Sequence, residues 1–119
     1  MNLLLVALGG AAGAVARYGA GRWIGPAARG GFPWATFAVN LAGSLLVGII
    51  VARTAPDDPR RLLLAVGFCG GLTTFSTFGY ETYALLQERA YGTALAYAGA
   101  SMAAGLGCVA LGLWAARVD

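Results

Sequence analysis

Four long stretches of the chain contain no charged residue, and this spacing limits the possible folds more than any other feature. The uncharged stretches cover residues 2–16, 30–52, 62–80 and 90–116. A helix needs about 20 mostly apolar residues to cross a lipid bilayer. Only 11% of the 119 residues are charged, whereas soluble domains carry about 25%. The sequence therefore predicts an all-α membrane protein, a single transmembrane domain with four helices near residues 3–24, 34–52, 62–86 and 93–116.

The composition argues against several functional classes. The chain has no His, which removes the commonest general base and the commonest metal ligand. Glu81 and Glu88 are the only acidic residues near a predicted span, so we expect no enzyme. The arginines lie at the edges of the spans and form no basic stripe, so we expect no nucleic-acid partner. Cys69 and Cys108 fall inside spans and are interpreted as small apolar residues.

The basic residues do not select an orientation in the membrane. Arginine normally accumulates on the cytoplasmic side, but here the two faces carry similar numbers. One face has Arg53, Arg60, Arg61 and Arg117, and the other has Arg17, Arg22, Arg29 and Arg89. One hypothesis is that both orientations are inserted and form an antiparallel homodimer. The alternative is that one or two boundary charges decide the orientation weakly.

The third span has an unusual composition for a membrane helix. Residues 67–78 read GFCGGLTTFSTF. The pair Gly70–Gly71 weakens a helix, and four hydroxyl side chains follow within five residues. A break in a membrane helix is tolerated where the freed backbone groups are buried in protein or line a wet cavity. We predict two half-helices separated near Gly70–Thr74; the alternative is a continuous helix whose hydroxyls bond to carbonyls one turn back.

Two other spans carry polar residues at four-residue spacing, which places them on one helix face. The two rows are Thr36, Asn40 and Ser44, and Thr93, Tyr97 and Ser101. Asn40 is the only carboxamide well inside a span, and its NH₂ group can donate to an anion. Each residue alone could simply join helices, but three polar segments together favour a polar pathway.

Aromatic rings accompany the hydroxyls of the third span. Phe75 and Phe78 are three residues apart and face the same side of a helix. The edge of a phenyl ring is electropositive, so ring edges and O–H donors suit a small, hard anion. Packing against lipid or protein is the alternative use of these rings. Composition alone does not identify the ion.

Three sequence features together resemble the Fluc/CrcB family of fluoride ion channels. They are GGLTTFSTF in the third span, Asn40 in the second, and GAVARY at residues 13–18. The resemblance covers the whole chain. It implies an antiparallel homodimer in the cell membrane with two pores, through which fluoride leaves the cell passively.

The resemblance also implies roles for individual residues. A structural sodium ion at the dimer centre would be held by the backbone carbonyls of Gly70 and Thr73. Arg17 and Glu81 would have vestibule or structural roles. Gly105 departs from the pattern, because some relatives continue the row of hydroxyls there. The residues implied to line the fluoride pore are Asn40, Phe75, Phe78, Thr77, Tyr97 and Ser101.

Two other functions fit a small four-span protein. A dual-topology multidrug exporter needs a carboxylate inside the membrane to couple to protons, but the first acidic residue is Asp57. A non-transporting assembly subunit would explain the 19 Gly residues but not the polar rows.

Overall fold

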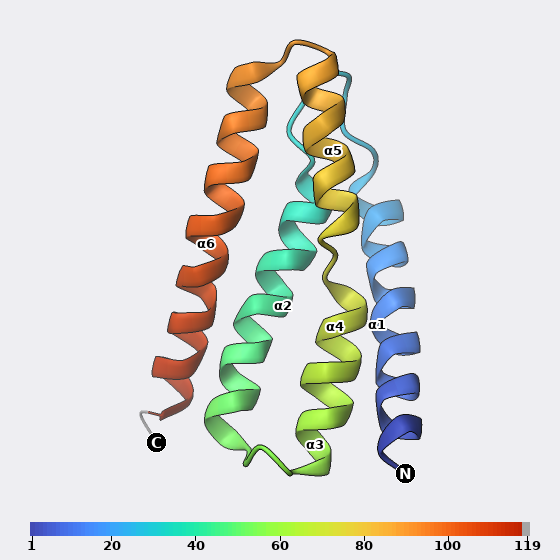
Figure 1. Ribbon diagram of the computed structural model, residues 1–119, viewed down its shortest axis with the longest axis vertical. Coiled ribbons are helices and arrows are strands. Elements are labelled where there is room, and N and C mark those ends of the chain that lie inside the picture. The colour runs from blue at the N-terminus through green and yellow to red at the C-terminus, as the bar shows by residue number, and fades with distance from the viewer. Residues whose placement is uncertain (118–119) are drawn as a thin grey trace.

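The computed structural model describes residues 1–117 and contains four helical spans in one bundle (Figure 1). Helix α1 covers Asn2–Ile24, α2 covers Trp34–Arg53 and α6 covers Tyr91–Arg117. The third span runs from Pro59 to Gln87 in several pieces. All four are long and apolar enough to cross a membrane. The prediction of an all-α protein with four membrane-spanning helices is confirmed.

The third span changes its geometry three times. It begins with a short turn, α3 (Pro59–Arg61), which continues into a π-helix, η1 (Leu62–Cys69), and then into the turn α4 (Gly70–Leu72). In a π-helix each N–H donates to the carbonyl five residues earlier, one residue further back than in an α-helix. The Gly70 N–H accordingly donates to the Ala65 carbonyl. Helix α5 (Ser76–Gln87) follows after an interruption. The predicted break is confirmed at residues 73–75, and the π-helix before it was not predicted.

Glycines allow the helices to pack in two close pairs. Helix α1 lies along η1 and α4, and α2 lies along α6. A Cβ atom added to Gly13 would come within 2.8 Å of the Leu72 nitrogen, and one added to Gly48 within 3.0 Å of the Leu113 nitrogen. Such contacts bring the helix backbones together, and this is how small residues favour helix association in lipid.

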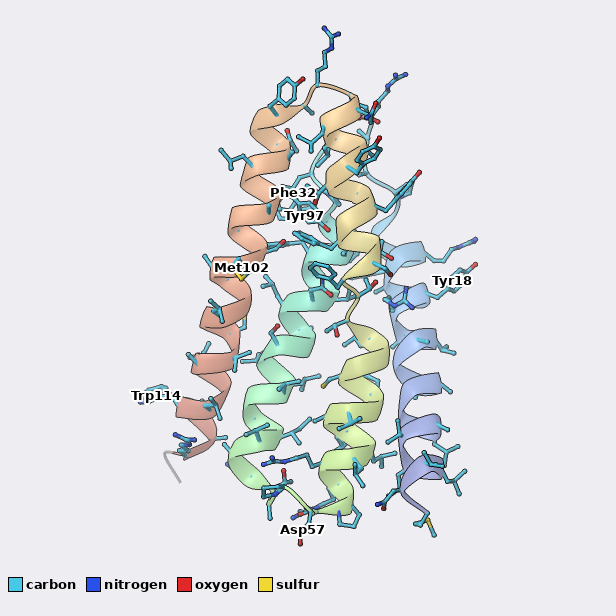
Figure 2. The ribbon with its side chains drawn as sticks, in the orientation of Figure 1. Tyr18, Phe32, Asp57, Tyr97, Met102 and Trp114 are labelled. Carbon is cyan, nitrogen blue, oxygen red and sulfur yellow. The ribbon has the colours of Figure 1, made fainter. Side chains whose placement is uncertain are left out.

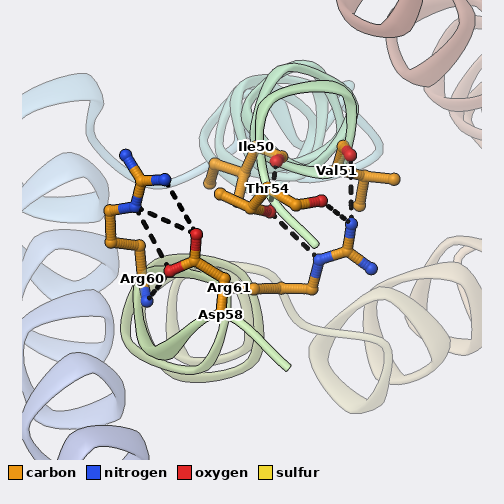
Figure 3. A network of polar contacts seen from close by, with 6 residues as sticks. All are labelled: Ile50, Val51, Thr54, Asp58, Arg60 and Arg61. Atoms are coloured by element: carbon orange, nitrogen blue, oxygen red, sulfur yellow. Dashed lines mark hydrogen bonds and ion pairs between the residues drawn. The ribbon is translucent and has the colours of Figure 1, made fainter. Parts of the chain in front are cut away.

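Arginines close the bundle at the end that carries the α2–α3 connection (Figure 3). Arg61 donates to the carbonyls of Val51 and Thr54 and to the Thr54 hydroxyl. Arg53 Nε donates to the Ala116 carbonyl at 3.0 Å. The last carbonyls of a helix have no intrahelical partner, so these guanidinium groups complete the C-terminal ends of α2 and α6.

Large apolar side chains cover much of the outside of the bundle. Tyr18 and Trp114 point away from the neighbouring helices (Figure 2), and both are more than half exposed. By contrast, Tyr97 is completely buried and packs with Phe32 near the α5–α6 end. An apolar exterior is unfavourable in water but suits the acyl chains of a bilayer.

Candidate functional site

The interruption of the third span is held open by Asn40. Thr73 has extended backbone angles, so the helix cannot continue through residues 73–75. The Thr74 N–H donates to Asn40 Oδ1 at 2.9 Å, and Asn40 Nδ2 donates to the Thr74 carbonyl at 3.2 Å. The Asn40 side-chain amide thus replaces both helical hydrogen bonds that the Thr74 backbone has lost. In lipid these groups would otherwise have no partner.

Two further contacts satisfy the ends of the half-helices. Arg17 Nε donates to the Gly71 carbonyl at 3.2 Å, which joins α1 to the end of the first half. The Thr77 N–H donates to Thr74 Oγ1 at 3.2 Å. A hydroxyl that accepts from the first turn is a typical N-terminal cap. Thr74 therefore ends one half-helix and starts the other.

The carbonyls of Gly70 and Thr73 lose their helical donors. In a continuous helix they would accept from the N–H groups of Thr74 and Thr77, but these donate to Asn40 and to the Thr74 side chain. Gly70 is exposed and Thr73 is partly buried. Backbone carbonyl oxygens are typical ligands of hard cations. These two oxygens could therefore take part in holding a small cation.

Aromatic rings lie on one side of the interruption. The ring centroids of Phe75 and Phe78 are 5.9 Å apart, and those of Phe78 and Tyr97 are 4.9 Å apart. Phe78 therefore packs against α6, while the Phe75 side chain is 82% exposed. The two phenylalanines are neighbours, as their spacing predicted, but Phe75 has little cover.

Tyr97 connects α6 to α5 and α2. Its hydroxyl donates to Glu81 Oε1 at 2.9 Å and also interacts with the Thr36 hydroxyl. Glu81 therefore lies beside the Tyr97 hydroxyl, in the second half of the third span. The carboxylate consequently has a protein hydrogen-bond donor instead of facing lipid.

Two cavities meet at the interruption, and Thr74 borders both. The first has a volume of about 300 Å³, and its lining includes Arg17, Thr36, Thr77 and Glu81. The second, between α2 and α6, has a volume of about 380 Å³. Its lining includes Asn40, Ser44, Thr73, Phe75, Phe78 and Ser101.

These cavities collect most of the residues singled out in the sequence. Tyr97 lies buried beside them, and Gly70 is exposed at the start of α4. No carboxylate lines the second cavity within the described part of the chain. Its polar lining consists of hydroxyls, the Asn40 amide and backbone groups of the interruption.

A sequence model of the family described as CrcB-like protein, Camphor Resistance (CrcB), matches residues 4–113. The chain belongs to the CrcB family. Three relatives carry the name fluoride-specific ion channel FluC. The Bordetella petrii protein is 48% identical and the Chlorobaculum tepidum protein 46%, each over 98% of this chain and over 92% and 95% of their own lengths. The Thermus thermophilus protein is 50% identical over 87% of this chain and 84% of its own length.

Thr74 is a residue at the interruption whose role the sequence did not predict. Its peptide is bound by Asn40, and its hydroxyl caps α5. A usable signal was present, because a hydroxyl residue shortly before a helix restarts is a typical start signal. Four hydroxyls within five residues made the capping residue impossible to distinguish from its neighbours.

Proposed function

We propose that this chain forms a fluoride-selective channel that lets fluoride leave the cell passively. The observation that carries the proposal is the similarity over nearly the whole chain to CrcB proteins named fluoride-specific ion channels. The site adds a physical argument. A dehydrated anion needs donors around it, and the second cavity offers donors without a carboxylate.

Hydroxyls and ring edges are the groups of this cavity that suit fluoride. The Ser101 hydroxyl is buried and has no hydrogen-bond partner among residues 1–117. Phe75 and Phe78 bring two rings to the same cavity. Ring edges carry partial positive charge without a mobile proton. They could therefore stabilise an anion without binding it as tightly as an arginine would.

The proposed channel is an antiparallel homodimer in the cell's inner or plasma membrane. Phe75 is highly exposed in one subunit although it lies in the interior of a span. A second copy would cover this ring and close the cavity toward lipid. The near-equal distribution of arginines between the two faces supports insertion in both orientations.

A structural sodium ion at the dimer centre is part of the proposal. The Gly70 and Thr73 carbonyls have lost their helical donors and fit this role, and a second copy would supply the same oxygens. When bound, a cation would neutralise the partial negative charge of these carbonyls. Arg17 and Asn40 would hold the neighbouring carbonyls of Gly71 and Thr74 away from it through their own hydrogen bonds.

Transport in this proposal needs no energy source in the protein. A negative-inside membrane potential drives an anion outward by about 2.3 kcal/mol per charge for each 100 mV. The multidrug exporter is disfavoured because α1 and α2 contain no carboxylate. The polar cavity between α2 and α6 disfavours a purely structural assembly subunit.

Ion efflux from liposomes tests the function. Purified protein should release trapped fluoride rapidly when valinomycin allows potassium to balance the charge, and it should release negligible chloride. Protein-free liposomes are the control. Equal release of both halides would refute selectivity, and no release of either would refute the channel.

Labelling from the two sides of the membrane tests the antiparallel arrangement. A cysteine placed at Ala55, which is exposed in the α2–α3 connection, should react with a membrane-impermeant maleimide from both sides. Cys69 and Cys108 would first be replaced by Ala. Reaction from only one side would rule out dual orientation.

A further inference from the structure

Helices α2 and α6 lie side by side and run in the same direction (Figure 1), and contacts between them set their register. Three contacts define this register: Thr36 with Tyr97, Ser44 with Gly105, and Gly48 with Val109. In each pair the α6 residue follows its partner by 61 positions. The same offset places Asn40 opposite Ser101, and both line the second cavity. The polar row of α2 therefore faces the polar row of α6.

The polar row on α6 ends at a glycine. Tyr97 and Ser101 are four residues apart, and the next position on the same face is Gly105. A Cβ atom added to Gly105 would lie 3.8 Å from Ser44 Oγ, with no other non-neighbouring atom within 4 Å. The Ser44 hydroxyl of α2 thus lies next to the space that a side chain at position 105 would enter.

Ser44 and Ser101 keep their hydroxyl protons available. Serine and threonine in helices often donate to the carbonyl four residues earlier. Thr54, Thr73 and Thr82 do so here, at 2.6, 2.9 and 2.8 Å. Among the described residues, no hydrogen bond involves the hydroxyl of Ser44 or Ser101. Both residues line the same cavity, so both hydroxyls can donate to a species inside it.

We propose that Ser44 is a fluoride-binding residue, which supplies from α2 the hydroxyl that Gly105 does not supply from α6. This inference rests on the proposed fluoride channel. The ion would pass the Phe75 and Phe78 rings and Ser101, and would then accept a hydrogen bond from Ser44. Because the Ser44 hydroxyl donates and carries no charge, it would hold the ion less tightly than an arginine would.

A substitution and its rescue test this role. Ser44→Ala removes one oxygen and suits a helix, so we expect the fold to be kept. We expect fluoride efflux to fall about tenfold, the effect of losing one hydrogen bond to a charged species. Gly105→Ser should restore most of the rate in the Ser44→Ala background. Gly99→Ser is the matched control, because Gly99 lies on the same helix with no atom within 4 Å of an added Cβ.

The outcomes separate this inference from the proposed function. If the wild-type protein releases no fluoride, the proposed function fails and Ser44 has no such role. If the wild type is active and Ser44→Ala matches it, Ser44 does not bind the ion. If Ser44→Ala is slow but Gly105→Ser and Gly99→Ser rescue it equally or not at all, Ser44 acts through packing. Rescue by Gly105→Ser alone, with unchanged elution as a dimer, supports the proposal.

Discussion

The hydrogen bonds between Asn40 and the Thr74 peptide allow a quantitative prediction about the interruption. Asn40→Leu keeps nearly the same shape but removes both bonds, at 2.9 and 3.2 Å. Each buried bond contributes about 1 kcal/mol, and each group left without a partner costs about 1–3 kcal/mol. The Thr74 N–H and carbonyl are only partly buried, so the lower part of this range applies. We expect Asn40→Leu to lower the free energy of unfolding by about 2–4 kcal/mol.

Asn40→Asp provides a graded comparison at the same position. The carboxylate can still accept from the Thr74 N–H, but it cannot donate to the Thr74 carbonyl and places negative charge against that oxygen. We expect reduced fluoride efflux together with a smaller loss of stability than in Asn40→Leu. Acidification that protonates the introduced carboxyl restores a donor, so part of the stability should return.

Reversible unfolding in mixed detergent micelles, titrated with dodecyl sulfate and followed by tryptophan fluorescence, measures these differences. Asn2→Leu is the matched control, because Asn2 is exposed at the start of α1 and undergoes the same chemical change. Surface substitutions usually change the free energy of unfolding by no more than about 0.5 kcal/mol. If the free energies of unfolding of Asn40→Leu and Asn2→Leu differ by less than this, Asn40 has no structural role at the interruption.

Three further predictions concern the rings, the helix packing and the connection. Phe75→Ile or Phe78→Ile should slow fluoride efflux at least about tenfold by removing the ring edge, and normal efflux in both would exclude the rings from the pathway. Gly48→Ala should destabilise the protein by about 1–3 kcal/mol because the added Cβ meets the α6 backbone. Gly107→Ala is the control, because the space around Gly107 is open. Equal unfolding curves for the two variants would contradict this packing. The Arg60 guanidinium holds the pKa of Asp58 below its ordinary value of 3.8. The small stabilisation from this exposed pair is therefore present at neutral pH and lost as the pH falls through that lowered pKa; Asp58→Asn should remove this acid dependence in unfolding curves, and an unchanged dependence would refute it.

The membrane fold and the approximate position of the interruption follow from the sequence alone. The uncharged stretches fix the four spans, because lipid requires about 20 apolar residues in each. Gly70, Gly71 and the following hydroxyls predicted a break close to the observed one, since these residues weaken a helix locally; the two glycines themselves stay helical in α4, and the break follows at residues 73–75. Such effects act between residues close in the chain, so they can be read without a structure.

The partners that hold the interruption depend on contacts between distant segments. Asn40 could have donated to an ion or joined two helices, and its position opposite Thr74 depends on how α2 lies against the third span. The π-helix of Leu62–Cys69 likewise has no local sequence signal. Its wider turns lie between the Arg61 contacts at one end and the Gly71 contact at the other. The parallel register of α2 and α6, which places Ser44 beside Gly105, depends on contacts between distant segments and could not be read from either helix alone.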